Sequence, residues 1–353
     1  MAGEKKRLSD SSLEASSLTI RDVAQLAGVS PATVSNVLNG TGRVSETTAK
    51  RVREVVDASN FKLNATARTL RQRSSRLIGV LVPLDEQATF EFNPYYWHFV
   101  DGVMQIAEEH GYDVILKAIV RDATPDIMHK RDLDGVIVIG AFDSSLVTES
   151  VISSGVSCVF VDSYISHQNV NLVNLDDRFG SYLAARHLLG LGHRKILFVS
   201  GQLTPDGVDH ERFLGFEQAL QESGCSMGIA PIQADISLES GKALAHRLAY
   251  EMNGITGIVT TADALAIGLL RGFKECGIAV PQQLSIVGFD DIPQSAFTIP
   301  SITTIHQDVH DKGFRAGQRL LQLINGNPNG KQQHLRLTPE LVVRESTGEV
   351  PRA

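Results

Sequence analysis

The sequence predicts an α/β protein in which a small unit of three helices precedes a larger body made of two lobes of parallel β-sheet. Three short amphipathic helical patterns, joined by tight turns, fill residues 19–62. From residue 77 to residue 353, apolar strand-like runs alternate with amphipathic helical stretches, which is typical of parallel sheets covered on both faces. The body is too long for one sheet of ordinary size, so we expect two lobes.

The three helices of the N-terminal unit are predicted from their caps. The pattern T-x-x-D at Thr19 is a capping box that opens the first helix. Gly28 ends it, because glycine accepts the positive φ that a tight turn requires. Ser30 is a good N-cap, Pro31 suits the first position of the second helix, and Ser45 caps the third. A short turn between the first two helices predicts a helix-turn-helix headpiece.

Two segments flank this headpiece. Residues 1–18 are polar and rich in serine, so we expect a disordered tail. The Lys5–Arg7 run in that tail is either solvated or in contact with phosphates. Residues 63–76 link the headpiece to the body, and Asn64 begins a short helical pattern that includes Arg68. A helix of this length is marginal when it is isolated.

The body contains seven strand-like runs and six helical stretches that alternate along most of its length. The predicted strands are residues 77–84, 113–118, 135–140, 156–162, 195–201, 257–261 and 284–290. The predicted helices are residues 94–110, 143–154, 178–191, 211–223, 238–253 and 263–276. In such α/β folds, ligands bind in the crevice at the carboxyl ends of the strands.

Charge is distributed unevenly between the two parts of the chain. Residues 1–76 contain 13 Lys and Arg against 7 Asp and Glu, a net charge of +6. The remaining residues contain 20 basic and 33 acidic side chains, a net charge of −13. A basic head on an acidic body favours a nucleic-acid-binding module, although a chance excess of surface cations gives the same numbers.

Composition excludes some classes of protein. Hydrophobic residues make up 42% of the 353 and charged residues 21%, as in ordinary globular proteins. The longest apolar runs, such as 77–84, are shorter than the roughly 18 residues that span a bilayer. The N-terminus has basic residues without an apolar stretch, so we expect no secretory signal. Cys158, Cys225 and Cys276 form no CxxC pair, which predicts free thiols in the cytoplasm.

Polar and aromatic side chains gather where the predicted strands end and the next helices begin. Carboxylates and a guanidinium can each bond two neighbouring hydroxyl groups, so they suit a hydroxyl-rich ligand. An aromatic ring that follows Pro94 can stack on a sugar or a base. Each of these side chains has a structural alternative as a helix cap, an ion pair or a core residue. The ligand-site candidates are Tyr95, Tyr96, Trp97, Asp162, Arg212 and Asp290.

No catalytic motif is present in the sequence. It contains no GxSxG elbow, no phosphate-binding GK[ST] loop and no GxGxxG after a strand, so we do not expect an enzyme. His306 and His310 are four residues apart, but His306 is predicted to end a strand. A shared helix face that binds a metal is therefore not expected.

The motifs together resemble the lactose/galactose repressor (LacI/GalR) family of bacterial transcription regulators. The helix-turn-helix segment TIRDVAQLAGVSPATVSNVLN (19–39) carries the resemblance most strongly. It continues in NATARTL (64–70), RLIGVLVP (76–83), NPYYWHFVDGV (93–103), HLLGLGHRKILFVSG (187–201), ERFLGF (211–216), SIVGFDD (285–291) and SITTIHQD (301–308). The resemblance therefore covers nearly the whole chain after residue 18.

The resemblance implies an architecture and partners. By this resemblance, residues 63–76 are expected to form a hinge helix and linker. The body is expected to be similar to periplasmic sugar-binding proteins. Lobe 1 then covers about residues 77–173 and 306–333, and lobe 2 about residues 174–305 and 334–353. The implied partners are double-stranded, pseudo-palindromic operator DNA, a sugar-like effector held by the ligand-site candidates, and further copies of the chain in a homodimer or a tetramer. No cofactor is implied.

The resemblance also assigns residues to DNA. Pro31, Ala32 and Asn36 on the second helix correspond to base-reading positions. Asn36 can bond an adenine edge, whereas Pro31 and Ala32 offer only apolar contacts; the alternative for Asn36 is a solvated side chain. Leu70 corresponds to a leucine that wedges into the minor groove, where a buried packing residue is the alternative. Further candidate contacts with DNA are Thr19, Ser30, Thr33, Ser35, Asn64 and Arg68.

Two positions depart from the family pattern. Leu63 stands at a position where the family often has proline, and Ala262 stands where a family member can have a ligand-binding asparagine. The second departure argues against assuming a particular ligand. Asp263, which follows Ala262, is expected to cap the next helix.

We therefore predict a cytoplasmic, sequence-specific DNA-binding regulator, in particular a repressor controlled by a sugar or a sugar derivative. One rival is a sugar-binding transport protein, which would need a secretory signal. The other is a cytoplasmic sugar-processing enzyme, which would need a phosphate loop.

Overall fold

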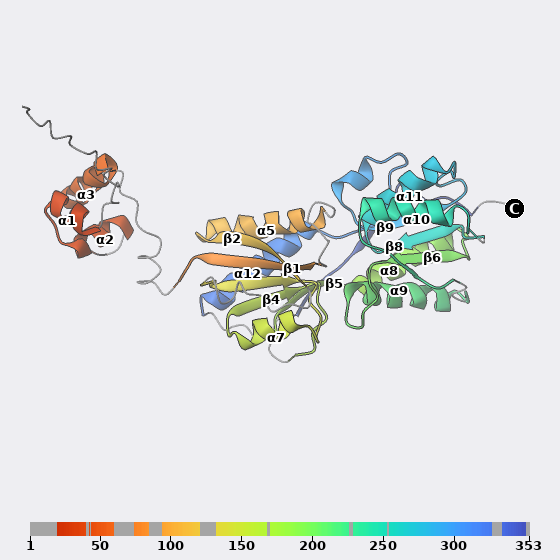
Figure 1. Cartoon of the computed structure of the whole chain (residues 1–353), viewed down its shortest axis with the longest axis horizontal. Coiled ribbons are helices and arrows are strands. Elements are labelled where there is room, and N and C mark those ends of the chain that lie inside the picture. Colours follow the sequence, from red (N-terminus) through yellow and green to blue (C-terminus); the bar gives the residue numbers. More distant parts are fainter. Residues whose placement is uncertain are drawn as a thin grey trace, which may run out of the picture. The chain divides into compact units, whose positions relative to one another are not determined.

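The computed structural model describes residues 20–39, 42, 44–59, 74–84, 94–120, 132–167, 170–225, 229–252, 254–326 and 334–350 (Figure 1). The chain divides into two compact units, Met1–Ser74 and Ser75–Ala353. Among the described residues, no helix is long and apolar enough to cross a bilayer.

The first unit contains the three predicted helices, α1 (Ile20–Ala27), α2 (Pro31–Asn39) and α3 (Glu46–Ser59). Gly28 ends α1 with a φ of +65°. The Ser30 hydroxyl accepts the amide N–H of Thr33 at 3.1 Å, and the Ser45 hydroxyl accepts that of Thr48 at 3.3 Å, so both predicted caps are confirmed. The helices share one apolar core, made of Val23, Ala24, Ala27, Val34, Val37 and Val52.

The first lobe of the body is a six-stranded sheet in the order β11-β5-β4-β3-β1-β2. Every neighbouring pair in it is parallel. Helices α5 and α12 pack on one face of this sheet and α7 on the other. The elements are β1 (Leu77–Leu84), α5 (Tyr95–Glu109), β2 (Asp113–Val120), β3 (Gly135–Ile139), α7 (Leu146–Ser153), β4 (Ser157–Val161), β5 (Leu172–Leu175), α12 (Val309–Ile324) and β11 (His334–Leu337).

The second lobe is a sheet in the order β12-β10-β9-β8-β6-β7, in which β12 pairs antiparallel and the other pairs are parallel. Helices α8 and α9 cover one face, and α10 and α11 the other. The elements are α8 (Asp177–Gly190), β6 (Ile196–Ser200), α9 (Val208–Glu222), β7 (Ile232–Gln233), α10 (Leu238–Leu248), β8 (Gly257–Thr260), α11 (Asp263–Glu275), β9 (Ser285–Asp290), the 3₁₀-helix η2 (Pro293–Ala296), β10 (Thr303–His306) and β12 (Glu340–Val342).

The chain passes between the lobes three times: from β5 to α8, from β10 to α12, and from β11 to β12. The last crossing lies later than the sequence suggests. Residues from 334 onward were expected in lobe 2, but β11 pairs with β5 in the first sheet. Because the HLRL sequence of this strand is half polar, its hydrophobic pattern does not indicate which sheet it joins.

Several elements were missed by the sequence analysis. Helix α12 was not predicted, although Ala316, Leu320 and Leu321 on it are buried and recur at helical spacing. The short strands β5, β7, β11 and β12 were also missed, because two to four residues are too few to show a period, whereas β10 was expected only through its end at His306. The seven predicted strands and six predicted helices are all present.

Candidate functional site

Helix α2 presents one face to the core of the first unit and the other to solvent. Val34 and Val37 are buried, whereas Pro31, Ala32 and Asn36 are exposed. The side chains to which the resemblance assigns base reading therefore lie together on the open face of the helix. Thr33 and Ser35 are half-buried at the sides of that face.

The start of α2 is the part of this face suited to phosphates. Ser30 is exposed, and its hydroxyl lies 2.9 Å from the Thr33 hydroxyl. Backbone N–H groups in the first turn of a helix attract anions. Four other predicted DNA contacts, Thr19, Asn64, Arg68 and Leu70, lie outside the described residues.

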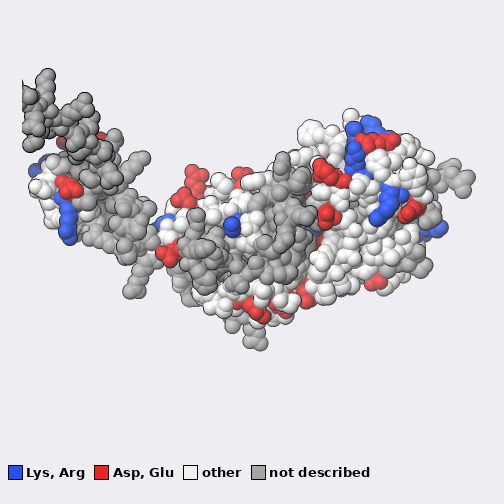
Figure 2. All heavy atoms as spheres, in the orientation of Figure 1, with Lys and Arg blue, Asp and Glu red and all other residues white. Residues whose placement is uncertain are grey.

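The positive charge of the N-terminal part is concentrated in a short stretch of sequence. Residues 60–76 contain five basic residues and no acidic one, which accounts for most of the net +6 of residues 1–76. On the face of the body in Figure 2, acidic atoms predominate among the coloured side chains of the first lobe. Attraction to a polyanion therefore depends mainly on residues 60–76.

The second lobe contributes Arg212, which lies in the first turns of α9 and is 6% exposed. Its Nε and Nη2 atoms lie 2.8 Å from one carboxylate oxygen of Asp177, at the start of α8. Its Nη1 donates to the Thr261 carbonyl at 2.5 Å and lies 3.8 Å from Asp290. The guanidinium carbon is 3.6 Å from the centre of the Phe289 ring. These contacts fix the guanidinium plane.

Asp290 ends β9 in an unusual backbone conformation, with a φ of +106°. Such conformations cost of order 1–3 kcal/mol and are concentrated at binding sites. The carboxylate is 6% exposed and accepts one hydrogen bond from Nε2 of Gln307 at 2.6 Å. Burial raises the pKa of Asp290 to about 8, although Arg212 and the Gln307 hydrogen bond both favour the charged form.

The first lobe contributes a second buried cluster. Asp162 follows β4 with a φ of +48°, and its carboxylate accepts hydrogen bonds from the Tyr95 hydroxyl and, at 2.8 Å, from Nζ of Lys312. Lys312 lies on α12 and is fully buried. Burial raises the pKa of Tyr95 well above its usual value, and the Asp162 charge adds to this shift.

Gln307 connects the two clusters. Its Oε1 accepts from Lys312 at 2.5 Å while its Nε2 donates to Asp290, and it lies on the crossing from β10 to α12. A second connection is made by the Tyr164 hydroxyl, which donates to Asp177 at 2.8 Å. We call the resulting set the inter-lobe network: Tyr95, Asp162, Tyr164, Asp177, Arg212, Asp290, Gln307 and Lys312. It places the carboxyl groups of three aspartates against two cations.

The three consecutive aromatics have different environments. Tyr95 is buried in the inter-lobe network. Tyr96 is half-buried and meets the Tyr95 ring edge-on, with 5.6 Å between the ring centres. Trp97 is 54% exposed. The structure therefore brings Tyr95 together with Asp162, Arg212 and Asp290 in one network, while Trp97 faces solvent.

Asp263 does not cap α11 as expected. Its carboxylate accepts from the Ile292 amide at 3.0 Å and from the hydroxyls of Ser295 and Thr304 at 2.6 and 2.7 Å. The cap position, Ala262, makes no side-chain hydrogen bond. Asp263 therefore holds η2 against the second sheet, and burial raises its pKa to about 7.

Sequence reasoning missed four members of the inter-lobe network, which are Tyr164, Asp177, Gln307 and Lys312. Asp177 resembles an ordinary residue of a first helical turn, and Gln307 lies between two elements without a motif. Lys312 occurs in the charged sequence HDKGFR, which suggests a solvated helix face. Its only signal would have been the apolar spacing of α12, which turns residue 312 toward the sheet.

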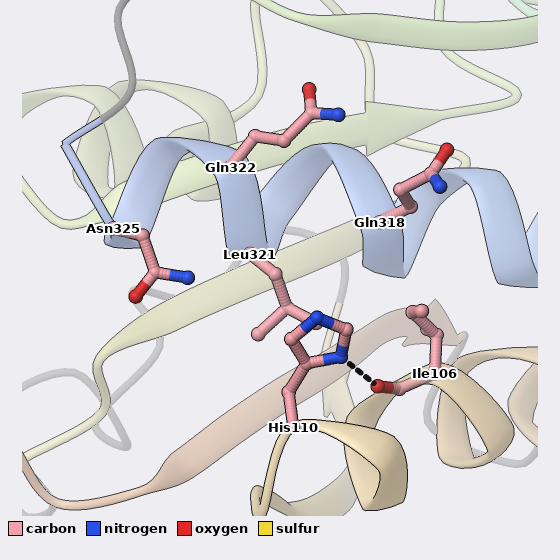
Figure 3. Close-up of a pocket in the computed structure, with 6 residues that line it drawn as sticks. All are labelled: Ile106, His110, Gln318, Leu321, Gln322 and Asn325. Atoms are coloured by element: carbon pink, nitrogen blue, oxygen red, sulfur yellow. Dashed lines mark hydrogen bonds between the residues drawn. The ribbon is translucent and has the colours of Figure 1, made fainter.

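A separate pocket of about 260 Å³ lies between α5 and α12 (Figure 3). The side chains of Gln318 and Gln322 point away from His110, whose Nδ1 lies 3.0 Å from the Ile106 carbonyl oxygen. The pocket is at the C-terminal end of α5, whereas Tyr95 is at the N-terminal end. It is therefore distinct from the inter-lobe network.

No group of three or more potential metal-binding side chains occurs within the described parts of the chain. His306 ends β10, as predicted, and its Nδ1 lies 2.9 Å from Asp291. His310 lies on α12, 3.6 Å from Asp101. The two histidines thus have different partners.

Comparison with known proteins gives matches along nearly the whole chain. Residues 19–64 match the model of bacterial regulatory proteins of the lacI family, and residues 185–347 match a periplasmic binding protein-like domain. The ribose operon repressor of Haemophilus influenzae is 31% identical over 337 residues, covering 93% of this chain and 98% of that protein.

Solved structures give the same picture. A Lac repressor dimer bound to operator and an anti-inducer superposes with a TM-score of 0.82 and 28% identity, covering 94% of this chain and all of that one. A regulator from Enterococcus faecium with bound ribose superposes with a TM-score of 0.68 and 27% identity, covering 78% of this chain and 99% of that one.

Proposed function

The chain belongs to the lacI family of bacterial regulatory proteins, and we propose that it is a transcriptional repressor whose operator affinity is set by a small hydroxyl-rich ligand bound between its lobes. The observation that carries this proposal is the inter-lobe network. It joins buried ionisable groups of both lobes through Gln307, so a ligand that bonds Asp290 or Arg212 acts on both lobes at once.

The chemistry of the network favours a sugar. Among the described residues, Asp290 accepts a hydrogen bond from Gln307, and its carboxyl group retains capacity to bond ligand hydroxyls. Both cations already face carboxylates, which leaves no surplus positive charge for an anion. The ribose operon repressor and the ribose-bound regulator support a sugar or sugar derivative.

On the DNA side, we propose that α2 enters the major groove and that Asn36 reads an adenine edge. Leu70 enters the minor groove at the centre of the operator. Ser30, Thr33 and Ser35 contact phosphates, together with Thr19 and the hinge residues Asn64 and Arg68. Because operator DNA is cytoplasmic in bacteria, we place the protein in the cytoplasm.

The working form is a homodimer, which matches the two-fold symmetry of a pseudo-palindromic operator. The Lac repressor structure is also a dimer. A surface for the second copy is offered by Phe297 and Ile299, which are 85% and 81% exposed beside η2. Large apolar side chains exposed next to each other commonly mark an interface.

Coupling between ligand and DNA follows from two arrangements of the lobes. A ligand shifts the balance by the difference between its affinities for the two arrangements. Such coupling is typically about 1–3 kcal/mol, a change in operator affinity of roughly 5- to 150-fold. One arrangement brings the paired hinge segments together, and the hinges then fold on DNA.

The experiment is a thermal-shift screen of the full chain with ribose, other neutral sugars and sugar phosphates. A ligand that binds only the folded state raises the melting temperature. We expect a neutral sugar to raise it in the wild type and not in Arg212→Ala. A shift that is equal in both proteins would place the ligand elsewhere.

A further inference from the structure

A second cluster of reactive side chains lies at the C-terminal ends of α10 and α11. Cys276 directly follows α11, and its sulfur lies 3.5 Å from Nδ1 of His246 on α10. The other ring nitrogen of His246, Nε2, lies 2.9 Å from the Glu275 carboxylate. The thiol thus contacts the imidazole and the imidazole contacts the carboxylate, an arrangement found in sites where a base activates a nucleophile.

Glu275 is held in its charged form. Its Oε1 atom lies 2.8 Å from Nε of Arg271 and 3.0 Å from Nζ of Lys242. Hydrogen bonds from Arg271, then from His246 and Lys242, lower the pKa of Glu275 to about 2. A carboxylate that stays ionised accepts the N–H of His246 at Nε2, so the lone pair at Nδ1 faces the thiol.

The two helices that carry the cluster are in backbone contact. A Cβ atom on Gly268 of α11 would lie 2.2 Å from the Leu238 carbonyl oxygen, and one on Gly241 of α10 would lie 2.5 Å from that of Leu265. Only glycine permits this approach. The close approach of the two helices brings the backbones that carry His246 and Cys276 near each other.

The other two cysteines have different surroundings. Burial raises the pKa of Cys158 to about 11, which suppresses its thiolate. Cys225 is half-buried, and its thiol lies 3.8 Å from the Ser223 carbonyl oxygen, an acceptor that is not a base. Cys276 is also half-buried, so the two thiols do not differ in burial class. They differ in that, within the part of the chain that the structure describes, an imidazole lies next to the Cys276 thiol and not next to the Cys225 thiol.

We propose that Cys276 is a modification site that reacts with low-molecular-weight disulfides. Nδ1 of His246 takes the thiol proton, and the Cys276 sulfur attacks one sulfur of the disulfide. A new S–S bond forms to that half as the original S–S bond breaks. The other half leaves as a thiolate and takes the proton back from His246, so atoms and electrons balance.

The test uses Ellman's disulfide, which releases a coloured thiolate for each thiol that reacts. The full-length protein is treated near neutral pH, and the modified peptides are identified by mass spectrometry at successive times. We expect Cys276 to react roughly tenfold faster than Cys225, because the neighbouring imidazole can take the thiol proton as the sulfur attacks. Equal rates for Cys276 and Cys225 in the wild type would overturn the proposal without any variant.

Variants separate the base from simple exposure. His246→Gln is expected to slow the reaction of Cys276 with Ellman's disulfide to the rate of Cys225. Glu275→Gln is expected to slow the same reaction less strongly. The matched control, His110→Gln, alters a histidine that lies 3.0 Å from the Ile106 carbonyl oxygen, and it should leave the rate unchanged. Far-ultraviolet circular dichroism confirms folding. A fast Cys276 in a folded His246→Gln protein would show that the imidazole has no part in the reaction.

Discussion

The surroundings of Lys312 are made by residues that are far from it in the sequence as well as near to it. It is fully buried, and its ammonium group donates to Asp162 and Gln307. Sequence reasoning located Arg212 and Asp290, because strand ends and helix starts are recognisable in the chain. It missed Lys312, because its partner Asp162 is 150 residues away and no local pattern connects them.

Replacing Lys312 by Met is expected to destabilise the protein by about 3–5 kcal/mol, because Asp162 is left buried without its cation. Urea unfolding at neutral pH measures the loss. The matched control is Lys242→Met, which removes a surface ion pair whose lysine is 46% exposed. Such pairs contribute at most about 1 kcal/mol. Equal losses in the two variants would show that the buried pair has no special importance.

Asp290 gives the ligand-free protein a pH dependence of known sign. Its carboxyl is neutral in the folded chain below about pH 8. In the unfolded chain it ionises near pH 4. The folded state therefore binds the additional proton, and the free energy of unfolding falls as pH rises from about 5 to about 8.

Asp290→Asn removes this contribution. We expect the free energy of unfolding of Asp290→Asn minus that of the wild type to become more positive as pH rises through that range. The reason is that only the wild type loses the contribution of Asp290. Other buried groups cancel in the comparison, including Asp263, whose pKa is about 7. A difference that is constant from pH 5 to pH 8 would mean that Asp290 is already ionised at the lower value.

At the scale of elements, prediction succeeded where the sequence pattern is local. The caps at Ser30 and Ser45 and the turn at Gly28 follow from single residues, and the long buried strands follow from apolar runs. Prediction failed for α12, where the charged sequence HDKGFR in the first half of the helix obscures the apolar face. It also failed for β11, because a four-residue strand takes its place from the sheet that it joins.

Leu70→Ala tests the hinge segment as an element. If Leu70 wedges into the minor groove, the variant should lose operator affinity and bend DNA less, because unstacking a base step permits the bend. Ligand binding, measured by thermal shift, should be unchanged. A circular-permutation gel compares the bends. Wild-type affinity and wild-type bend would identify Leu70 as a packing residue.

At the scale of the whole molecule, charge and architecture support DNA binding by residues 1–76 and ligand binding by the two-lobed body. Residues 1–76 carry a net +6 and the remainder −13, so the segment that meets DNA is attracted to it and the body is repelled. The chain crosses between the lobes three times, which lets both lobes respond to one ligand. The sequence predicted two lobes and four members of the inter-lobe network, but not Gln307 and Tyr164, which connect the lobes.

Phe297→Asp tests the dimer. A charge placed on an apolar interface is expected to weaken association strongly, and a monomer should lose affinity for a two-site operator. Sedimentation velocity measures the oligomer. The control is Tyr250→Asp, at a residue that is 91% exposed beyond the end of α10. A dimeric Phe297→Asp protein would exclude this surface as the interface.

The central claim is that ligand binding in the inter-lobe network changes operator affinity. Operator fragments are selected from genomic DNA with the full-length protein, and their affinity is measured by gel shift with and without the sugar that raises the melting temperature. We predict a change of roughly 5- to 150-fold in the wild type. We predict none in Arg212→Ala or Asp290→Ala, although both still bind the operator. The same operator affinity with and without a bound sugar in the wild type would contradict the account.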